Sequence, residues 1–382
     1  MFRASLGSIF WRVNIMRELF AFVVCLLVVA GAIFSWFLQP VVGVTSIAEL
    51  DEKLKVGFIY VGPPGDHGWN YQHDQGRLAV DKALGDRVQT VFVESVPEGP
   101  EAEPIIERLV QDGAELIFTT SFGHMDPTIK IAERYPEVKF EHATGYKRRD
   151  NVSTYSSRFY EGRYVIGQIA GRMSKTGQAG YIASFPIPEV MRGINAFLLG
   201  AQSVNPDFRL KVVWVDSWFD PMQEINAANT LIANGVDILT QHTDSTAVVQ
   251  VAEENGVYAF GQASDMTPFA PDFLLTSIID HWDEYYIQRT RAALDDTWTS
   301  TDTFGGMDVN MVRMGGFKNM PNSVKSMAEA TMADIISGAQ YPFAGPITKQ
   351  DGSQVVGVGE KLDLKTLLTM DWYIQGVDVL LP

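Results

Sequence analysis

Residues 65–70, Gly-Asp-His-Gly-Trp-Asn, gather side chains that a simple turn does not need, directly after an apolar segment. Asp66 offers acceptor oxygens, Asn70 offers both a donor and an acceptor, and Trp69 offers a flat ring. Stacking a base on an aromatic side chain contributes about 1–3 kcal/mol, and carboxylate and amide groups distinguish one ring edge from another. The combination predicts binding of a flat heterocycle.

Aromatic and short polar side chains also follow other apolar segments further along the chain. In open parallel sheets, ligands bind outside the carboxyl ends of the strands, so we expect these side chains to share one site. The candidate ligand-binding residues are Tyr60, Asp66, Trp69, Asn70, Phe122, Gly123, His242, Asp244, Gln262 and Asp265.

Several of these residues also have a structural interpretation that the sequence leaves open. Asp66 and Asp244 are suited to cap the helices that follow them. Trp69 and Phe122 are large apolar rings that could belong to the core. We interpret Asn70 as functional, because the start of a helix offers its side chain little to do.

Metal binding and catalysis find little support. His67 and His73, with Asp66 and Asp74, could form a metal site, but their spacing places them on different sides of a turn and a helix. The chain has no G-x-S-x-G, H-E-x-x-H or phosphate-loop motif, and its single cysteine, Cys25, lies in an apolar N-terminal run. We therefore expect a protein that is not an enzyme and has no cofactor or metal.

The elements that must position the candidate residues alternate along the chain. Apolar segments typical of buried strands are 55–61, 89–96, 115–121, 138–143, 179–184, 210–216, 236–241, 257–262 and 273–277. Helical patterns cover 70–84, 101–112, 126–135, 161–173, 187–203, 221–234, 244–255, 280–295 and 321–337. This alternation predicts a parallel α/β fold in two doubly wound series, 53–155 and 156–270.

The N-terminus and the charge limit the location and the partners. Arg3, Arg12 and Arg17 precede an apolar run at 19–38, which predicts that residues 1–48 are a secretory signal or a membrane anchor. The rest of the chain is then expected outside the cytoplasm, in the periplasm or its equivalent. The net charge of −16 argues against a nucleic-acid partner, whose phosphates call for a basic face.

The order and spacing of several motifs resemble one known family. The motifs are Gly-Asp-x-x-Trp-Asn at 65–70, Ser-Phe-Gly at 121–123, Tyr-Pro-Glu-Val-Lys-Phe at 135–140, Glu-Gly-Arg-Tyr-Val-Ile-Gly at 161–167 and Ile-Ile-Ser-Gly at 335–338. Together they look like the basic membrane protein (Bmp) family of purine-nucleoside-receptor-like substrate-binding proteins of ABC importers.

The resemblance implies a fold, a partner and a division of the chain. The family fold is a type I periplasmic binding protein, with two Rossmann-like lobes joined by a hinge and the ligand in the cleft between them. The implied lobe 1 contains 53–155 and about 271–297, and lobe 2 contains 156–270 and about 298–382. A purine-like ligand and an ABC permease in the membrane are the implied partners.

Two positions depart from the family pattern. Ala263 stands where the family's nucleoside receptors carry the first Asp of G-x-D-x-D, and Asp280 stands near the place of a family Lys. In the family those two groups lie near the ribose, so their loss predicts a free nucleobase such as adenine rather than a nucleoside. The alternatives are a membrane-anchored sensor of the same fold, an enzyme of nucleoside or sugar metabolism, or a binding protein for a sugar or another small solute.

Overall fold

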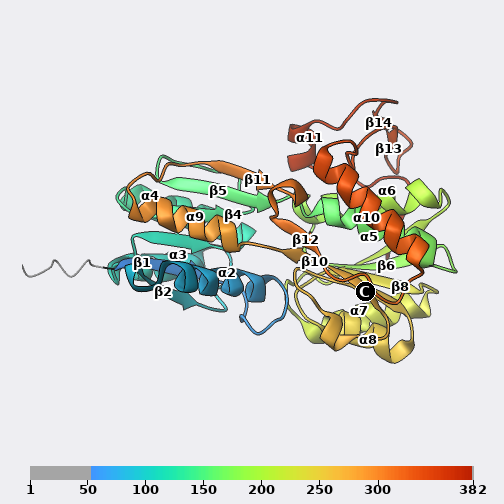
Figure 1. Cartoon of the computed structure of the whole chain (residues 1–382), viewed down its shortest axis with the longest axis horizontal. Helices are drawn as coiled ribbons and strands as arrows, with labels where there is room; N and C mark the ends of the chain where they lie inside the picture. The colour runs from blue at the N-terminus through green and yellow to red at the C-terminus, as the bar shows by residue number, and fades with distance from the viewer. Residues whose placement is uncertain (1–52, 381–382) are drawn as a thin grey trace, which may run out of the picture. The chain divides into compact units, whose positions relative to one another are not determined.

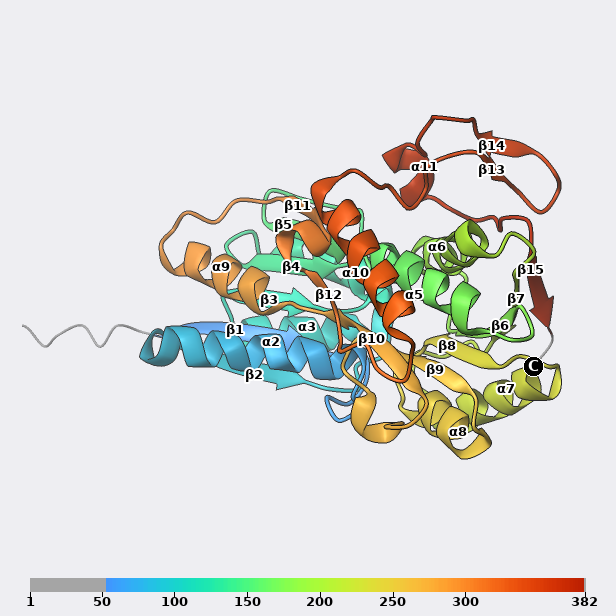
Figure 2. The same ribbon diagram turned by 45° about the vertical axis from the view of Figure 1, so that its right-hand side comes forward.

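The computed structural model describes residues 53–380, so the expected signal or anchor at 1–48 lies outside the described residues. Two large β-sheets carry most of the described chain, and a two-stranded sheet lies near its end (Figures 1 and 2). We call the first large sheet with its helices lobe 1, and the second with its helices lobe 2. Within residues 53–380, no helix combines the length and the apolar character needed to cross a bilayer.

Lobe 1 is built on six strands in the order β11-β5-β4-β3-β1-β2, and all neighbours run parallel. The strands are β1 (Leu54–Ile59), β2 (Val88–Val93), β3 (Leu116–Thr119), β4 (Lys139–Ala143), β5 (Val152–Ser157) and β11 (Asp302–Gly305). Its α-helices are α2 (Trp69–Leu84), α3 (Glu103–Gln111), α4 (Met125–Arg134) and α9 (Asp283–Leu294).

Side-chain alternation along β1 explains why helices cover both faces of this sheet. Val56 and Phe58 pack into one apolar cluster with residues of α2 and α9, whereas Ile59 packs into another with residues of α3 and α4. Successive side chains of a strand point to opposite faces, so a strand that is apolar throughout needs cover on both.

Lobe 2 is built on seven strands in the order β12-β10-β9-β8-β6-β7-β15, and only the β10–β12 pair is antiparallel. The strands are β6 (Gln178–Ala183), β7 (Arg209–Trp214), β8 (Ile238–His242), β9 (Tyr258–Gly261), β10 (Leu274–Asp280), β12 (Val312–Met314) and β15 (Val377–Leu380). One apolar cluster contains residues of α5 (Tyr160–Met173), α6 (Pro188–Val204) and α10 (Asn322–Ser337), and another contains residues of α7 (Pro221–Ala233) and α8 (Ala247–Asn255).

The remaining elements are short. The C-terminal segment forms the hairpin of β13 (Ile347–Thr348) and β14 (Gln354–Val356), then α11 (Leu364–Leu368), before β15 pairs with β7. Short 3₁₀ helices are η1 (Gly85–Arg87), η2 (Pro100–Ala102), η3 (Phe122–His124), η4 (Thr267–Phe269) and η5 (Met307–Val309).

The chain passes between the lobes three times: from β5 to α5, from β10 to α9, and from β11 to β12. Side chains hold these connections together. Ser157 Oγ donates to Asp280 Oδ1 at 2.8 Å, and Arg158 Nη1 donates to the carbonyl of Phe304 at 2.7 Å. Arg158 also pairs with Glu161 and Asp308, so one cation links all of the segments around the β5–α5 and β11–β12 crossings.

The architecture confirms the expected α/β fold of two doubly wound lobes, but strand pairing assigns two segments to a different lobe than expected. The expectation gave about 271–297 to lobe 1, yet β10 pairs with β9 of lobe 2. It gave the chain from about 298 onward to lobe 2, yet β11 pairs with β5 of lobe 1. Hydrogen bonding between strands decides both memberships, and the local sequence of a strand does not name its partner strand.

Candidate binding site

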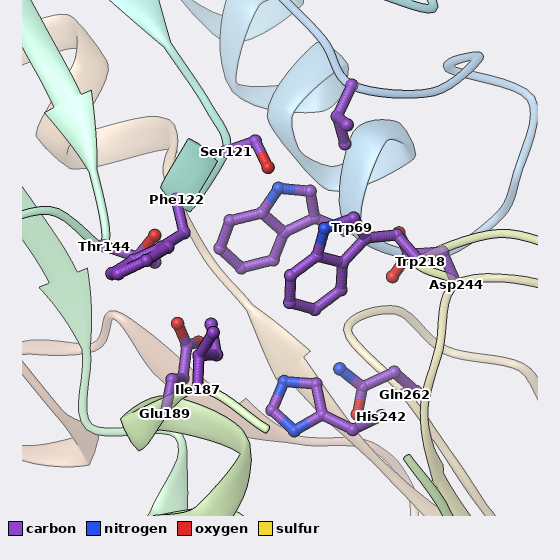
Figure 3. Close-up of a pocket in the computed structure, with 11 residues that line it drawn as sticks. Trp69, Ser121, Phe122, Thr144, Ile187, Glu189, Trp218, His242, Asp244 and Gln262 are labelled. Atoms are coloured by element: carbon purple, nitrogen blue, oxygen red, sulfur yellow. The ribbon is translucent and has the colours of Figure 1, made fainter. Parts of the chain in front are cut away.

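A cavity lies between the two lobes at the carboxyl ends of their strands (Figure 3). Its lining comes from Val61, Trp69, Ser121, Phe122 and Thr144 of lobe 1 and from Ile187, Glu189, Trp218, His242, Asp244 and Gln262 of lobe 2. The space free of atoms amounts to ≈ 360 Å³ including the opening, and it is a narrow slot that leaves little room for water.

Trp69 forms part of the lobe 1 wall at the first residue of α2. Its indole Nε1 donates to the carbonyl of Thr120 at 2.6 Å, and the rings of His73 and Trp282 pack edge-on against it at centroid distances of 4.4 and 5.7 Å. The hydrogen bond and the two rings fix the indole before any ligand arrives. A preset flat surface avoids the entropy loss of ordering a side chain on binding.

Trp218 enters the same cavity from the loop after β7 in lobe 2. Its Nε1 donates across the cleft to Glu98 Oε2 of lobe 1 at 3.2 Å. Glu98 in turn accepts hydrogen bonds from Ser121 Oγ at 2.5 Å and from the amide of Gly123 at 2.8 Å. The contact joins the lobes beside the cavity, so the structure is in a closed arrangement. Figure 3 shows Phe122 on the other side of the cavity from the two indole rings.

Gln262 and His242 form the lobe 2 side of the cavity near the buried Arg163. Arg163 donates a short hydrogen bond to Gln262 Oε1, while the Gln262 Nε2 group has no partner among residues 53–380 and points into the cavity in Figure 3. His242 is buried, with its Nδ1 3.4 Å from the Tyr181 hydroxyl. Burial lowers the pKa of His242 well below its ordinary value, and Arg163 and Arg192 act in the same direction, so the ring is neutral.

Two carboxyl groups also face the cavity. Glu189 is partly exposed, and burial raises its pKa while Arg192 and Arg163 oppose that rise. Asp244 is buried; burial raises its pKa well above the ordinary value, and the carboxylates of Asp66 and Glu224 raise it further. The cavity therefore places carboxyl oxygens beside the Gln262 amide and the neutral His242 ring, so it can pair with both donor and acceptor atoms of a ligand.

The structure brings five of the ten predicted residues into the cavity: Trp69, Phe122, His242, Asp244 and Gln262. Asp66 and Asn70 are instead buried beside it and tie the turn at 62–70 together. Asp66 accepts hydrogen bonds from the amides of Gly68, Asn70 and Tyr71, which is the capping alternative. Asn70 donates to Asp66 at 2.7 Å and accepts from the amide of Gly62 at 3.2 Å, so both its nitrogen and its oxygen are bonded within lobe 1.

The other three predicted residues also lie outside the cavity lining. Tyr60 is buried in lobe 1, where its hydroxyl donates to Asp74 Oδ1 at 3.1 Å. Asp265 is exposed and accepts from the amide of Thr267 at 3.0 Å, at the start of η4. Gly123 supports Glu98, because a Cβ at this position would lie 2.6 Å from the Glu98 side chain.

Sequence reasoning missed lining residues that obey the same rule. Trp218 follows β7, Glu189 and Ile187 follow β6, and Thr144 follows β4. Their positions after strand ends could have predicted them, since every lining residue lies at or after the carboxyl end of a strand. A complete reading of strand ends would have found them.

The alternative metal site does not form. His73 is buried, stacks on Trp282 at a centroid distance of 5.0 Å, and has its Nδ1 2.5 Å from the Tyr286 hydroxyl. His67 instead faces Tyr71 and Phe269. Within residues 53–380, no group of His, Cys, Asp and Glu side chains has the arrangement of a metal site.

Two Rossmann-like lobes joined by three connections, with a cavity between the carboxyl edges of their sheets, define a type I periplasmic binding protein. A solved structure of an ABC transporter solute-binding protein from Aeropyrum pernix K1 has this fold: it aligns with a TM-score of 0.67 at 20% identity over 82% of this chain and 95% of the other.

Sequence comparison gives the family. The profile of the Bmp family, described as ABC transporter substrate-binding protein PnrA-like, matches residues 53–349, and the chain belongs to this family. It is 61% identical to a purine-binding protein of Brucella abortus (strain 2308), over 88% of this chain and 96% of the relative. It is 38% identical to a protein of Haloferax volcanii described as a candidate glucose-binding protein of an ABC transporter, over 77% and 75%.

Proposed function

We propose that this ABC transporter substrate-binding protein binds a purine nucleobase, such as adenine, in the cavity between its lobes. The observation that carries the proposal is a narrow slot with aromatic rings from both lobes and unpaired polar groups at its lobe 2 side. A purine presents two flat faces to the rings, and its N–H groups and ring nitrogens match the carboxyl and amide groups. The 61% identity to a purine-binding protein supports the same ligand class.

A base fits the proposal better than a nucleoside. Ala263 is fully buried and has no side-chain acceptor for a ribose hydroxyl, and Asp280, which accepts from Ser157 at 2.8 Å, does not line the cavity. Among residues 53–380, no lysine lines the cavity. Each of these features removes a partner that a sugar would need.

The proposed mechanism is closure of the two lobes about their three connections. The ligand contacts Trp69 and Phe122 from lobe 1 and Trp218, Glu189, His242, Asp244 and Gln262 from lobe 2. Because these contacts exist together only when the cleft is closed, binding shifts the population toward the closed form. Bonds across the cleft, such as Trp218 to Glu98, add to that shift.

The closed form is then the state that an ABC permease in the membrane recognises. The proposal includes export of residues 53–382 by the N-terminal segment and no chemical change of the ligand. If that segment is retained instead, the same domain acts as a membrane-anchored sensor. Determining the N-terminal residue of the mature protein separates these two outcomes.

Isothermal titration calorimetry on the full chain, refolded from denaturant to remove any bound ligand, tests the proposal. We expect adenine to bind more tightly than adenosine, and glucose to show no binding. Adenosine binding more tightly than adenine would refute the preference for a base. Absence of binding by every purine would refute the ligand class.

A sugar is the second candidate, because a relative at 38% identity is described as glucose-binding and tryptophan rings also pack on sugar rings. Mass spectrometry of small molecules that copurify with the protein distinguishes the two. A sugar released on denaturation would favour this second candidate.

A further inference from the structure

Arg163 lies behind the cavity with its guanidinium group fully buried. Its Nη1 donates to Thr240 Oγ1 at 3.0 Å and its Nη2 donates to the carbonyl of Gln241 at 2.7 Å. The rings of Phe159 and Tyr181 flank it at 5.0 and 5.1 Å. These contacts hold the guanidinium in one orientation, with Nη2 also directed at Gln262.

The chemistry of Arg163 decides which end of the Gln262 amide faces it. A guanidinium group has five N–H donors and no acceptor, so only the amide oxygen of Gln262 can bond to it. The amide nitrogen must then point away from Arg163 and toward the cavity (Figure 3). If the amide turned over, two donors would meet inside a buried region, which is strongly unfavourable.

The polar neighbours of this nitrogen in the cavity include two carboxyl groups. Glu189 and Asp244 present carboxyl groups, and residues 53–380 provide no hydrogen bond to the Glu189 carboxyl. The Gln262 amide is thus a fixed donor beside two carboxyl groups, each of which keeps an acceptor oxygen in either protonation state. The donor can bond to an acceptor atom of a ligand, and the carboxyl oxygens can bond to its N–H groups, so binding depends on where both lie on the ring.

We infer that Arg163 is a positioning residue that makes Gln262 a fixed donor, so that the site selects a ring edge with an unprotonated nitrogen near an exocyclic N–H group. The inference rests on the proposed function and deepens it from purines in general to those with an acceptor nitrogen at this place. A ring that carries C–H at that place leaves the Gln262 donor unpaired inside a closed cleft, and a buried site discriminates strongly on that basis.

The substitution Gln262→Glu tests the protein side of this pair. Glutamate has nearly the same shape, still accepts from Arg163 with one oxygen, and presents an acceptor to the cavity instead of a donor. We expect adenine affinity to fall about 10- to 100-fold, because a buried hydrogen bond is lost and two acceptors, the new carboxylate oxygen and the ligand nitrogen, face each other instead. The melting temperature should not fall, because the buried Arg163 gains a charged partner.

Two further variants serve as controls. Gln250→Glu adds the same charge on the exposed face of α8, where we expect unchanged affinity. Gln262→Met removes both amide contacts, and we expect it to lower affinity and melting temperature together. The opposite response of Gln262→Glu, weaker binding without lower stability, is the signature of a positioning role, which a merely structural contact would not produce.

The ligand side needs only the unaltered chain. In a calorimetric series of 1-, 3- and 7-deazaadenine, the analogue that lacks the nitrogen facing Gln262 should bind about tenfold or more weakly than adenine. The same analogue should lose nothing further in Gln262→Glu, because the two changes remove one interaction. Equal affinity of wild type for adenine and all three analogues, or full adenine affinity in Gln262→Glu, would overturn the inference. A wild-type chain that binds no purine at all would overturn the proposed function beneath it.

Discussion

A close backbone approach of the two lobes gives a direct test of cleft closure. Gly68 of lobe 1, just before α2, lies against the backbone of Asp244 in lobe 2. A Cβ at Gly68 would lie 2.4 Å from the Asp244 carbonyl oxygen and 2.9 Å from its Cα. Ordinary contacts of this kind begin near 3.4 Å, so the Gly68→Ala protein must hold its lobes about 1 Å further apart.

The expected loss of affinity follows from the cost of the clash. Overpacking by one methyl group in a tight contact costs about 1–3 kcal/mol, and here that cost falls only on the closed form. Binding requires that form, so adenine affinity should fall about 5- to 150-fold. The two lobes can separate in the unliganded protein, so its melting temperature should change little.

Gly65 supplies the matched control within the same turn. It is exposed, and a Cβ there would meet nothing within 4 Å, so Gly65→Ala should bind adenine as tightly as the wild type. Calorimetry measures the affinities, and small-angle X-ray scattering with and without adenine reports closure as a fall in the radius of gyration. If Gly68→Ala binds within twofold of wild type, the lobes do not close to this geometry on binding. Equal losses in both variants would instead indicate damage to the turn.

Three further changes probe the same structure. Trp218→Phe keeps a ring but loses the N–H bond to the Glu98 carboxylate, so adenine should dissociate about 5- to 10-fold faster. The effects of Glu98→Ala and Trp218→Phe should not add in the double mutant, because both remove the same bond. A change confined to the association rate would contradict this prediction. Trp69→Ala should weaken adenine binding by about tenfold or more while Trp69→Phe retains most of it and both stay folded, and unchanged affinity would place the site elsewhere. Burial lowers the pKa of His142 from 6.5 to about 3, so between these pH values the unfolded chain is protonated at His142 and the folded chain is not. The stability contributed by the neutral ring is therefore complete above pH 6.5 and is lost as the pH falls toward 3. Buried carboxyl groups with a raised pKa stabilise the folded protein as the pH falls, so the melting temperature of wild type alone would not isolate His142. The measurement is therefore the difference in melting temperature between wild type and His142→Gln, which should narrow as the pH falls from 7 to 4. A constant difference would contradict the assignment.

The predictability of the fold follows from the character of each strand. Segments such as β1 (Leu-Lys-Val-Gly-Phe-Ile) and β3 (Leu-Ile-Phe-Thr) are mostly apolar and buried, so their pattern alone predicted them. The strand β5 reads Val-Ser-Thr-Tyr-Ser-Ser, and no apolar pattern marks it. Its hydroxyl groups are satisfied only by distant partners, for example Ser153 by Arg289 and Thr154 by Asp302. Such a strand cannot be recognised until its partners are in place.

The same distinction separates the site residues. Trp69 and Gln262 were predicted because strand ends carry ligand contacts, which is a property of the chain order. Asn70 looked equally promising in sequence, but in the folded turn its side-chain amide forms hydrogen bonds with Gly62 and Asp66 instead of facing the cavity. Whether a polar group is free or used depends on neighbours that the local sequence does not name.

The sequence by itself determined the alternation of strands and helices, the family, and the edge of each sheet at which a ligand contact can occur, because these depend on local periodicity and on motif order. The tertiary structure alone decided which lobe holds β10 and β11, which aromatic rings line the cavity, and which way the Gln262 amide points. The physical reason is that hydrogen bonds and packing between residues far apart in the chain satisfy or expose a polar group, and no local pattern encodes those partners.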